Sequence, residues 1–306
     1  MTVKATIRGQ EITLTYDSST GLYKASVTAP SDSSYTNNTG HYFPVSVTAT
    51  DDAGNSTTVS DTQGNFKENL KLYVKEKVAP KVTGVSPSSG ANITTSNPTF
   101  EFNVVDNSNG QSSGFSGINP DTIQLVVNGT TIENSKITKT PITGGFKCSY
   151  VSEAAIPDGD RTYTVKVNDY DGNTSETVST TFKIDTVPPV LEVSQPVDGT
   201  STNKNTVDVI GYTSDATSSP VTVKIYVNGN DTGSVDLDGS GNFVKTVTLS
   251  DGENIIKIVS TDKIGKFSEI TRTVYLKTTA PVFKSVKIEP NPVDAGNSYT
   301  IFVEVV

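Results

Sequence analysis

The residues of this sequence that could do chemistry are mainly carboxylates, and they recur in one motif. An aspartate followed three positions later by a glycine ends three alternating segments: Asp51 with Gly54, Asp169 with Gly172, and Asp262 with Gly265. Such an aspartate can close a tight hairpin by accepting backbone N–H groups, while the glycine adopts positive φ. Carboxylates are also calcium ligands, and Asp171 and Asp185 lie near Asp169 in the sequence. We expect solvated turns and no cofactor, with calcium at domain junctions as the alternative.

A second acidic segment, DLDGSGN, resembles the start of a calcium-binding EF-hand loop. It offers oxygen atoms at Asp236, Asp238, Ser240 and Asn242, with Gly241 in the sixth position. The twelfth position is Val247, where an EF-hand needs a bidentate glutamate, and the flanking sequence is not helical. The pattern therefore favours a hairpin turn.

Paired acids, Asp51 with Asp52 and Asp158 with Asp160, could indicate glycoside hydrolysis. That reaction needs two carboxylates across a cleft whose environments push their pKa values apart. We place these acids on exposed hairpin tips, where nothing would separate the pKa values. The sequence therefore predicts a protein that is not an enzyme, with no catalytic, cofactor-binding or metal-ligating residues.

The chain has one cysteine, Cys148, and one histidine, His41, in different repeats. This composition excludes intrachain disulfides, and it argues against zinc sites and Cys–His catalysis. Cys148 lies in the alternating run GGFKCSYV, which predicts a half-buried strand position.

The net charge is −9 and no basic run occurs, so nucleic acid is not expected as a partner. No segment approaches the roughly 18 apolar residues of a membrane span, and Met1 is followed by strand-like sequence rather than a signal peptide. We therefore expect neither membrane insertion nor export of the given chain by the general secretory route.

Internal repeats predict the domain organisation. Each Asp-x-x-Gly motif follows residues that alternate with period two, and a further strand then runs into a proline linker at Pro80, Pro188–Pro189 or Pro281. Asn128-Gly129 and Asn228-Gly229 mark two-residue hairpins at equivalent positions. The predicted fold class is all-β, an extended array of tandem sandwiches, with complete domains at 79–187 and 188–280 of about seven strands each.

The segments PPVLEVSQPVDGTSTNKNTVDVIGYTSD and DGSGNFVKTVTLSDGENIIKIVSTDKIGKFS carry a family resemblance. They are similar to the bacterial and phage immunoglobulin-like (Big-type) tandem repeats of surface proteins, phage tail proteins and accessory regions of polysaccharide-acting enzymes. The resemblance extends over essentially the whole chain and is strongest in the third repeat. It implies the sandwich fold, but such repeats serve as stalks, spacers and binding modules alike.

The two ends match complementary parts of one repeat. Residues 1–78 form a partial domain that lacks the first two strands, because Arg8-Gly9 aligns with Asn228-Gly229. Residues 281–306 are the two-strand start of a further domain. Three explanations are open: arbitrary boundaries or a reduced first sandwich, completion by other proteins, and strand addition between copies of the chain.

These observations predict a structural and adhesive protein. We expect a phage tail or baseplate component, located in the virion, that acts as a spacer or host-surface contact. The alternative is a segment of a bacterial cell-surface adhesin or an accessory region of a polysaccharide-acting enzyme. The expected partners are other structural proteins of the particle, the chain itself through residues 281–306, and host-surface glycans. Exposed aromatic residues could stack on sugar rings; the candidates are Tyr35, Tyr42, Phe43 and Tyr170.

Overall fold

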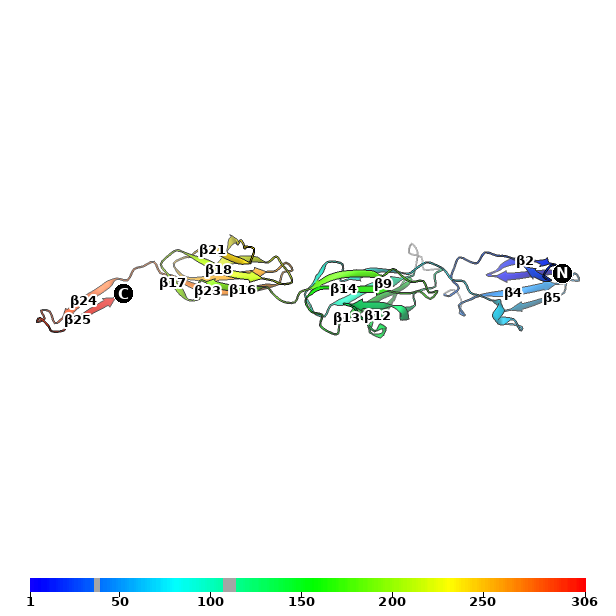
Figure 1. Cartoon of the computed structure of the whole chain (residues 1–306), viewed down its shortest axis with the longest axis horizontal. Coiled ribbons are helices and arrows are strands. Elements are labelled where there is room, and N and C mark those ends of the chain that lie inside the picture. The colour runs from blue at the N-terminus through cyan, green and yellow to red at the C-terminus, as the bar shows by residue number, and fades with distance from the viewer. Residues whose placement is uncertain (36–38, 107–113) are drawn as a thin grey trace. The chain divides into compact units, whose positions relative to one another are not determined.

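The computed structural model describes residues 1–35, 39–106 and 114–306. Its internal contacts divide the chain into two compact units, Met1–Thr186 and Val187–Val306. Figure 1 labels the strands along the chain.

The first sheet of the Met1–Thr186 unit has the strand order β3-β2-β1-β4-β5, and β6 also pairs with β4. Arg8 and Gly9 join β1 to β2 with φ values of 50° and 78°, the left-handed pair that a two-residue hairpin requires. The elements are β1 (Thr2–Ile7), β2 (Gln10–Asp17), β3 (Leu22–Lys24), β4 (Phe43–Thr50), β5 (Ser56–Ser60), the 3₁₀ helix η1 (Lys67–Leu70) and β6 (Lys71–Leu72).

Two further sheets of the same unit form a sandwich, with strand orders β11-β10-β14-β15-β8 and β12-β13-β9-β7. Its strands are β7 (Lys81–Ser86), β8 (Ala91–Ile93), β9 (Thr99–Val105), β10 (Gln124–Val127), β11 (Thr130–Thr131), β12 (Thr138–Ile142), β13 (Gly145–Val151), β14 (Gly159–Lys166) and β15 (Val178–Ile184). Two short 3₁₀ helices, η2 (Pro120–Thr122) and η3 (Asn134–Lys136), lie in its connections.

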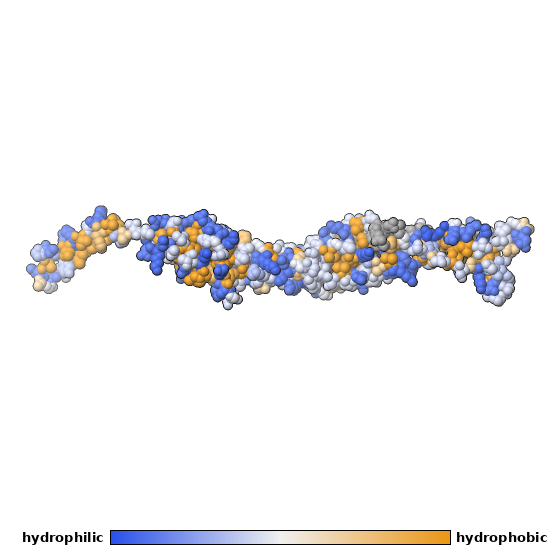
Figure 2. Space-filling view, turned by 90° about the horizontal axis from the view of Figure 1, so that it is seen from above, coloured by the Kyte–Doolittle hydropathy of each residue, from blue (hydrophilic) through white to orange (hydrophobic). Residues whose placement is uncertain are grey.

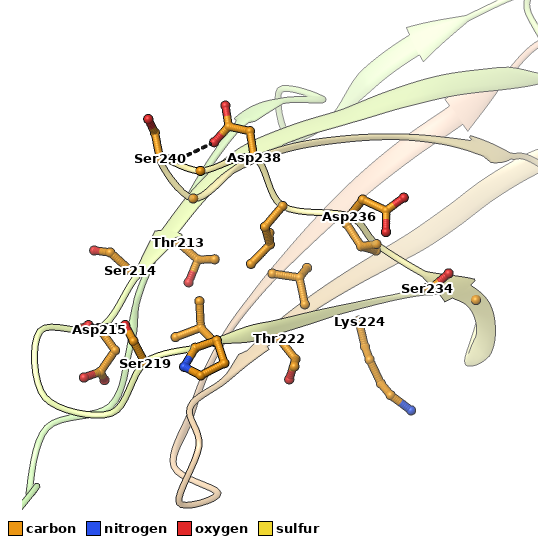
Figure 3. Close-up of a pocket in the computed structure, with 18 of the residues that line it drawn as sticks. Thr213, Ser214, Asp215, Ser219, Thr222, Lys224, Ser234, Asp236, Asp238 and Ser240 are labelled. Atoms are coloured by element: carbon orange, nitrogen blue, oxygen red, sulfur yellow. Dashed lines mark hydrogen bonds between the residues drawn. The ribbon is translucent and has the colours of Figure 1, made fainter.

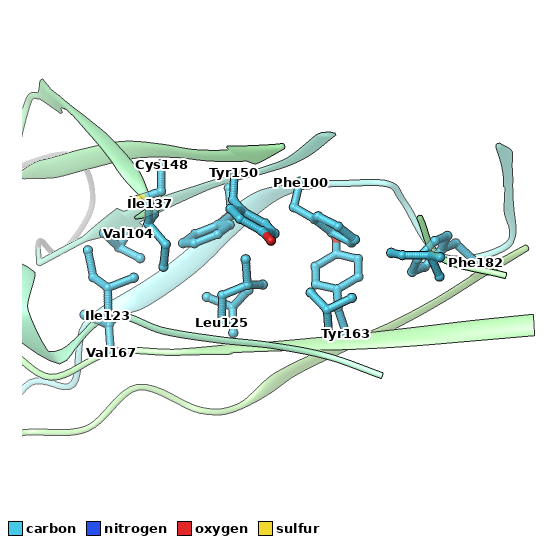
Figure 4. Close-up of a cluster of buried hydrophobic side chains, with 14 of the residues drawn as sticks. Phe100, Val104, Ile123, Leu125, Ile137, Cys148, Tyr150, Tyr163, Val167 and Phe182 are labelled. Carbon is cyan, nitrogen blue, oxygen red and sulfur yellow. The ribbon is translucent and has the colours of Figure 1, made fainter. Parts of the chain in front are cut away.

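The core of this sandwich follows from strand alternation. In β9, Phe100, Phe102 and Val104 are fully buried and alternate with more exposed residues. The Phe100 ring lies 5.0 Å from the Tyr163 ring and 5.7 Å from the Phe182 ring, both edge-on. Figure 4 shows these aromatic side chains meeting between the two sheets.

Cys148 lies in this core, on β13, and is fully buried. The sequence correctly predicts the strand, although the position is more buried than the half-buried one expected. Burial raises the pKa of its thiol to about 11, because the thiolate would lose its hydration.

We therefore expect Cys148 to resist alkylation by iodoacetamide at pH 8 in the native protein. The thiolate is the reactive form, and here it is both scarce and inaccessible. Labelling measured by mass spectrometry should be complete only in denaturant, and rapid labelling of the native chain would contradict this account.

The Val187–Val306 unit contains a second sandwich, with strand orders β16-β18-β21 and β17-β23-β22-β19-β20. Its core includes Val209, Ile225, Phe243, Ile256 and Ile258, each at most 2% exposed. Its strands are β16 (Val190–Gln195), β17 (Thr200–Thr202), β18 (Thr206–Ser214), β19 (Thr222–Val227), β20 (Asn230–Ser234), β21 (Asn242–Thr248), β22 (Gly252–Thr261) and β23 (Phe267–Leu276).

The last two strands, β24 (Phe283–Glu289) and β25 (Thr300–Val305), pair only with each other among the described strands. Neighbouring residues of β25 are exposed alike, with Ile301 at 56% and Phe302 at 51%, so both faces of the strand pair present apolar side chains. Figure 2 shows hydrophobic side chains on the face of this strand pair that is in view.

The predicted all-β class and immunoglobulin-like sandwich architecture are confirmed. Both Asn-Gly hairpins are also confirmed, with φ values of 48° and 79° at Asn128 and Gly129, and 50° and 84° at Asn228 and Gly229. The four domain boundaries stay a prediction. Among the described residues, no helix is long and apolar enough to cross a membrane.

Candidate functional site

The three Asp-x-x-Gly motifs all form the predicted turns. In each, the aspartate N–H donates to the carbonyl oxygen four residues on, and the glycine N–H donates back to the aspartate carbonyl. The aspartate Oδ1 accepts further backbone N–H groups, from Asn55 at Asp51, Asn173 at Asp169 and Lys266 at Asp262. Gly54, Gly172 and Gly265 have φ values of 89°, 93° and 94°, as these turns require.

The DLDGSGN segment forms a fourth turn of the same kind. Asp238 Oδ1 accepts the N–H groups of Ser240 and Asn242 at 2.9 and 2.8 Å, and the Asn242 side chain donates to Asp238 Oδ2. The predicted hairpin is therefore confirmed, with the Asp238 carboxylate engaged in holding it.

At the second motif, three buried carboxylates meet. Glu76, Asp106 and Asp169 are 7%, 1% and 2% exposed, and each offers an oxygen atom within 4.8 Å of the other two. They come from different segments of the Met1–Thr186 unit. Glu76 lies between β6 and β7, Asp106 directly follows β9, and Asp169 opens the turn after β14. The fold thus brings together charges that are 30 or more positions apart in the sequence.

Polar groups around this acidic cluster hold the carboxylates in place. Asn173 donates its side-chain N–H groups to Glu76 Oε1 at 2.9 Å and to Asp169 Oδ2 at 2.7 Å. The Gly117 N–H donates to Asp106 Oδ2 at 2.6 Å, and the Glu76 N–H donates to Asp171 Oδ2 at 3.0 Å. Ser116 lies between Glu76 and Asp106, at 3.5 and 3.4 Å.

Positive charge does not balance this acidic cluster. The ion pairs of lysine and arginine in the described residues all involve other carboxylates. Lys75 and Lys77 flank Glu76 in the sequence, and the Lys75 ammonium group donates to the Asp171 carbonyl oxygen at 3.3 Å. Asp106 Oδ1 is buried and has no hydrogen-bond partner.

The pKa of Asp106 is raised to about 6, mainly by burial. The neighbouring charges of Asp169 and Asp171 contribute to this rise, and the hydrogen bonds from Gly117 and Ser116 oppose it. Burial also raises the pKa of Glu76, and the nearby Asp169 and Asp106 carboxyl groups add to the shift. Both effects have the same cause, since a carboxylate loses hydration and gains repulsion here.

These raised pKa values predict that the free energy of unfolding depends on pH. The prediction applies in buffer with a chelator, so that no cation is bound by the carboxylates. A carboxyl group with a raised folded-state pKa binds more protons when folded, so its stabilising contribution is complete below the unfolded pKa of about 4. That contribution is lost as the pH rises through about 6 at Asp106.

Thermal unfolding of the wild type and of the Asp106→Asn variant at pH 4.5, 6 and 7.5 measures this effect. Asparagine keeps the oxygen that accepts from Gly117 but cannot ionise. The variant should therefore gain stability relative to the wild type as the pH rises. A difference that stays constant across this range would contradict the account.

The other acids singled out in the sequence lie elsewhere. Asp185 follows the end of β15 that pairs with Gly159, whereas Asp169 lies at the opposite end of the β14–β15 hairpin. Asp51 is exposed in its turn. Asp158 accepts from the Thr186 N–H and hydroxyl group, and Asp160 forms an ion pair with Lys183 at 3.6 Å.

The predicted aromatic candidates are not equally available. Tyr35 stacks on Tyr170 at 4.3 Å and on His41 at 3.9 Å between ring centroids, so these rings largely cover one another. Tyr42 donates its hydroxyl group to Asp61 at 2.9 Å. The prediction for Phe43 was wrong, because its side chain is only 3% exposed. The Arg8 guanidinium group lies 4.9 Å from the centroid of its ring.

A groove of about 980 Å³ lies in the Val187–Val306 unit, between the start of β19 and residues 233–241. Figure 3 shows hydroxyl groups and carboxylates around it. Its apolar lining comes from Pro220, Val221, Val223, Val235 and Leu237, and Lys224 forms an ion pair with Asp231 at 3.3 Å at one side. None of its lining residues is aromatic, so stacking on a sugar ring is not available there.

Sequence reasoning identified Asp169 and its neighbour Asp171 but missed Glu76 and Asp106. Glu76 sits beside the linker of Pro80, and Asp106 ends the alternating strand PTFEFNVVD. Both residues adjoin a predicted boundary between elements, and this position is the feature of the sequence that could have identified them as site residues. What the sequence could not give is the pairing geometry that brings the segments together.

One protein-family model matches the second sandwich. Residues 189–278 match the family model of glucodextranase, domain B. Among curated proteins, none matches the chain.

Several solved structures resemble the chain at low identity. The fibronectin(III)-like modules of CbhA from Clostridium thermocellum are 15% identical, with 64% of this chain and 94% of that chain covered and a TM-score of 0.36. Sidekick-1 immunoglobulin domains 1–5 are 13% identical, with 100% and 60% covered and a TM-score of 0.41. A 1.5-MDa bacterial ice-binding adhesin is 19% identical, with 90% and 86% covered and a TM-score of 0.31. The chain is similar to these proteins as an array of immunoglobulin-like and fibronectin-like domains.

Proposed function

We propose that this chain is a non-enzymatic array of immunoglobulin-like domains that acts as a spacer or contact element at a surface. One observation carries the proposal: the same three-stranded ladder recurs along the chain. It consists of β1-β4-β5, then β10-β14-β15, then β19-β22-β23, each with the same Asp-x-x-Gly turn between its second and third strands. Repetition of one packing unit is the usual way to build length from small domains.

Two settings fit this role. The first is a phage tail or baseplate, where such a protein would be part of the virion. The second is a bacterial cell-surface adhesin or an accessory region of a polysaccharide-acting enzyme, and the match of residues 189–278 to glucodextranase domain B favours it. Genes for tail proteins beside this one would support the first setting. An upstream signal peptide with a wall anchor would support the second.

A glycan array probed with the purified full chain tests the contact half of the proposal. Binding to a bacterial or host-surface glycan supports a contact element. Absence of signal on every glycan would remove the adhesive role and leave the spacer role. A Tyr42→Ala variant, which removes a partly exposed ring, should lose signal if aromatic stacking contributes to binding.

We further propose a second copy of the chain as the partner of β24 and β25. The sheet β3-β2-β1-β4-β5 has one face without a second sheet in the described residues, whereas its counterpart β11-β10-β14-β15-β8 belongs to a complete sandwich. Strand addition would cover apolar side chains on both partners. Light scattering of the chain with and without residues 281–306 tests this, and an unchanged mass after truncation would contradict it.

A further inference from the structure

The acidic cluster of Glu76, Asp106 and Asp169 has an electrostatic imbalance that the protein alone does not resolve. Three carboxylates with oxygen atoms within 4.8 Å of one another are nearly excluded from water. Burying a charged group without a counter-charge is costly, and burying like charges together is more so. Hydrogen bonds from Asn173 and Gly117 orient the carboxylates but supply no positive charge.

A second, independent observation points to a ligand at this place. Asp106 is 1% exposed, and its Oδ1 atom is buried without a hydrogen-bond partner. Buried polar atoms are nearly always paired, so an orphaned oxygen on a carboxylate of this acidic cluster calls for an explanation. A cation bound between them would pair this oxygen and neutralise the repulsion.

We propose that Glu76, Asp106 and Asp169 form a calcium-binding site. All three offer oxygen atoms, which suit hard cations, whereas zinc and copper prefer nitrogen and sulfur ligands. Calcium–oxygen bonds of roughly 2.3–2.6 Å place ligands on opposite sides of the ion roughly 4.6–5.2 Å apart. Oxygen atoms that all lie within 4.8 Å of one another can therefore bind the same calcium ion. Magnesium demands near-ideal octahedral geometry and gives up its water ligands reluctantly, so a site built from protein carboxylates suits calcium better.

The surrounding groups are arranged as supports for such a site. Asn173 bonds Glu76 and Asp169 together, and the Gly117 N–H fixes Asp106 through Oδ2, which leaves Oδ1 for the cation. Hydrogen bonds of this kind orient metal ligands and contribute to metal affinity.

The site also has a structural consequence within the Met1–Thr186 unit. Glu76 belongs to the segment that leaves the first sheet, whereas Asp106 and Asp169 belong to the sandwich that follows. Bound calcium would therefore fasten residues 74–78 to the ends of β9 and β14. Calcium would stabilise this attachment by binding the folded state and not the unfolded one.

Isothermal titration calorimetry with calcium chloride tests the proposal on the full chain after dialysis against chelator. The variants are Asp106→Asn and Glu76→Gln, which alter two different segments. The matched control is Asp51→Asn, which changes the exposed aspartate of the equivalent turn in the first sheet. Far-UV circular dichroism checks that each variant is folded. If Asp106→Asn does not fold, the comparison with Glu76→Gln tests the site.

We expect the wild type and Asp51→Asn to bind calcium equally. Each cluster variant should lose one bound ion per chain or bind it at least about tenfold more weakly. Magnesium should bind the wild type more weakly than calcium. Equal calcium binding by the wild type and both cluster variants would overturn the assignment, as would an absence of calcium binding by the wild type.

Discussion

Replacing Phe100 with alanine should destabilise the sandwich of β7–β15 by about 3–5 kcal/mol. The Phe100 side chain is fully buried and contacts the rings of Tyr150, Tyr163 and Phe182. The substitution removes its burial energy, leaves a cavity between the sheets, and ends three aromatic contacts. Because a domain is stable by only about 5–15 kcal/mol, the variant should lie close to unfolding at room temperature.

Hydrogen exchange in increasing urea, read by mass spectrometry on peptides from β9, β13 and β14, measures this loss. Val151→Ala is the matched control, because Val151 lies on the same sheet but is 57% exposed. The control should change stability by at most about 0.5 kcal/mol. Equal effects of the two substitutions would contradict the assignment of Phe100 to the core.

Replacing Gly241 with alanine should destabilise the second sandwich by about 2–4 kcal/mol. Gly241 has a φ of 89°, which costs an alanine roughly 1–2 kcal/mol. A Cβ atom there would also lie 2.1 Å from the Thr213 carbonyl oxygen, too close for contact. The turn would have to move away from β18, and the hydrogen bond from the Thr213 N–H to the Gly241 carbonyl would be lost.

Gly239 provides the control within the same turn. Its φ lies outside the left-handed region, and a Cβ atom there would meet nothing within 4 Å. Gly239→Ala should therefore change the free energy of unfolding by no more than about 0.5 kcal/mol. Urea denaturation followed by tyrosine fluorescence compares the two, and a Gly241→Ala variant as stable as the control would show that the turn is free to move.

Local patterns were sufficient to predict most of the fold. The alternation around Phe100, the Asn128-Gly129 and Asn228-Gly229 hairpins, and the Asp-x-x-Gly turns each act over a few residues, so the sequence carries them directly. Their repetition then indicates equivalent strands in successive domains. Even Arg8-Gly9, which contains no asparagine, could be assigned by alignment with the later repeats.

The acidic cluster could be predicted only in part, because it depends on contacts between distant segments. The motif reveals Asp169, but an aspartate in the same motif at Asp51 is exposed. Asp169 differs from Asp51 because it is buried and lies close to Glu76 and Asp106. Phe43 shows the same limit, because the sequence pattern placed it among the exposed aromatic residues whereas the folded chain buries it.

A spacer or contact array requires its sandwiches to fold as separate modules. The most direct measurement is urea unfolding of residues 187–280 expressed alone. The buried core residues of the second sandwich, from Val209 to Leu276, all lie within this range. The fragment should therefore unfold in one cooperative transition, with a free energy of unfolding of about 5 kcal/mol or more. A fragment without a cooperative transition, or without slow amide exchange in β22 and β23, would contradict the account.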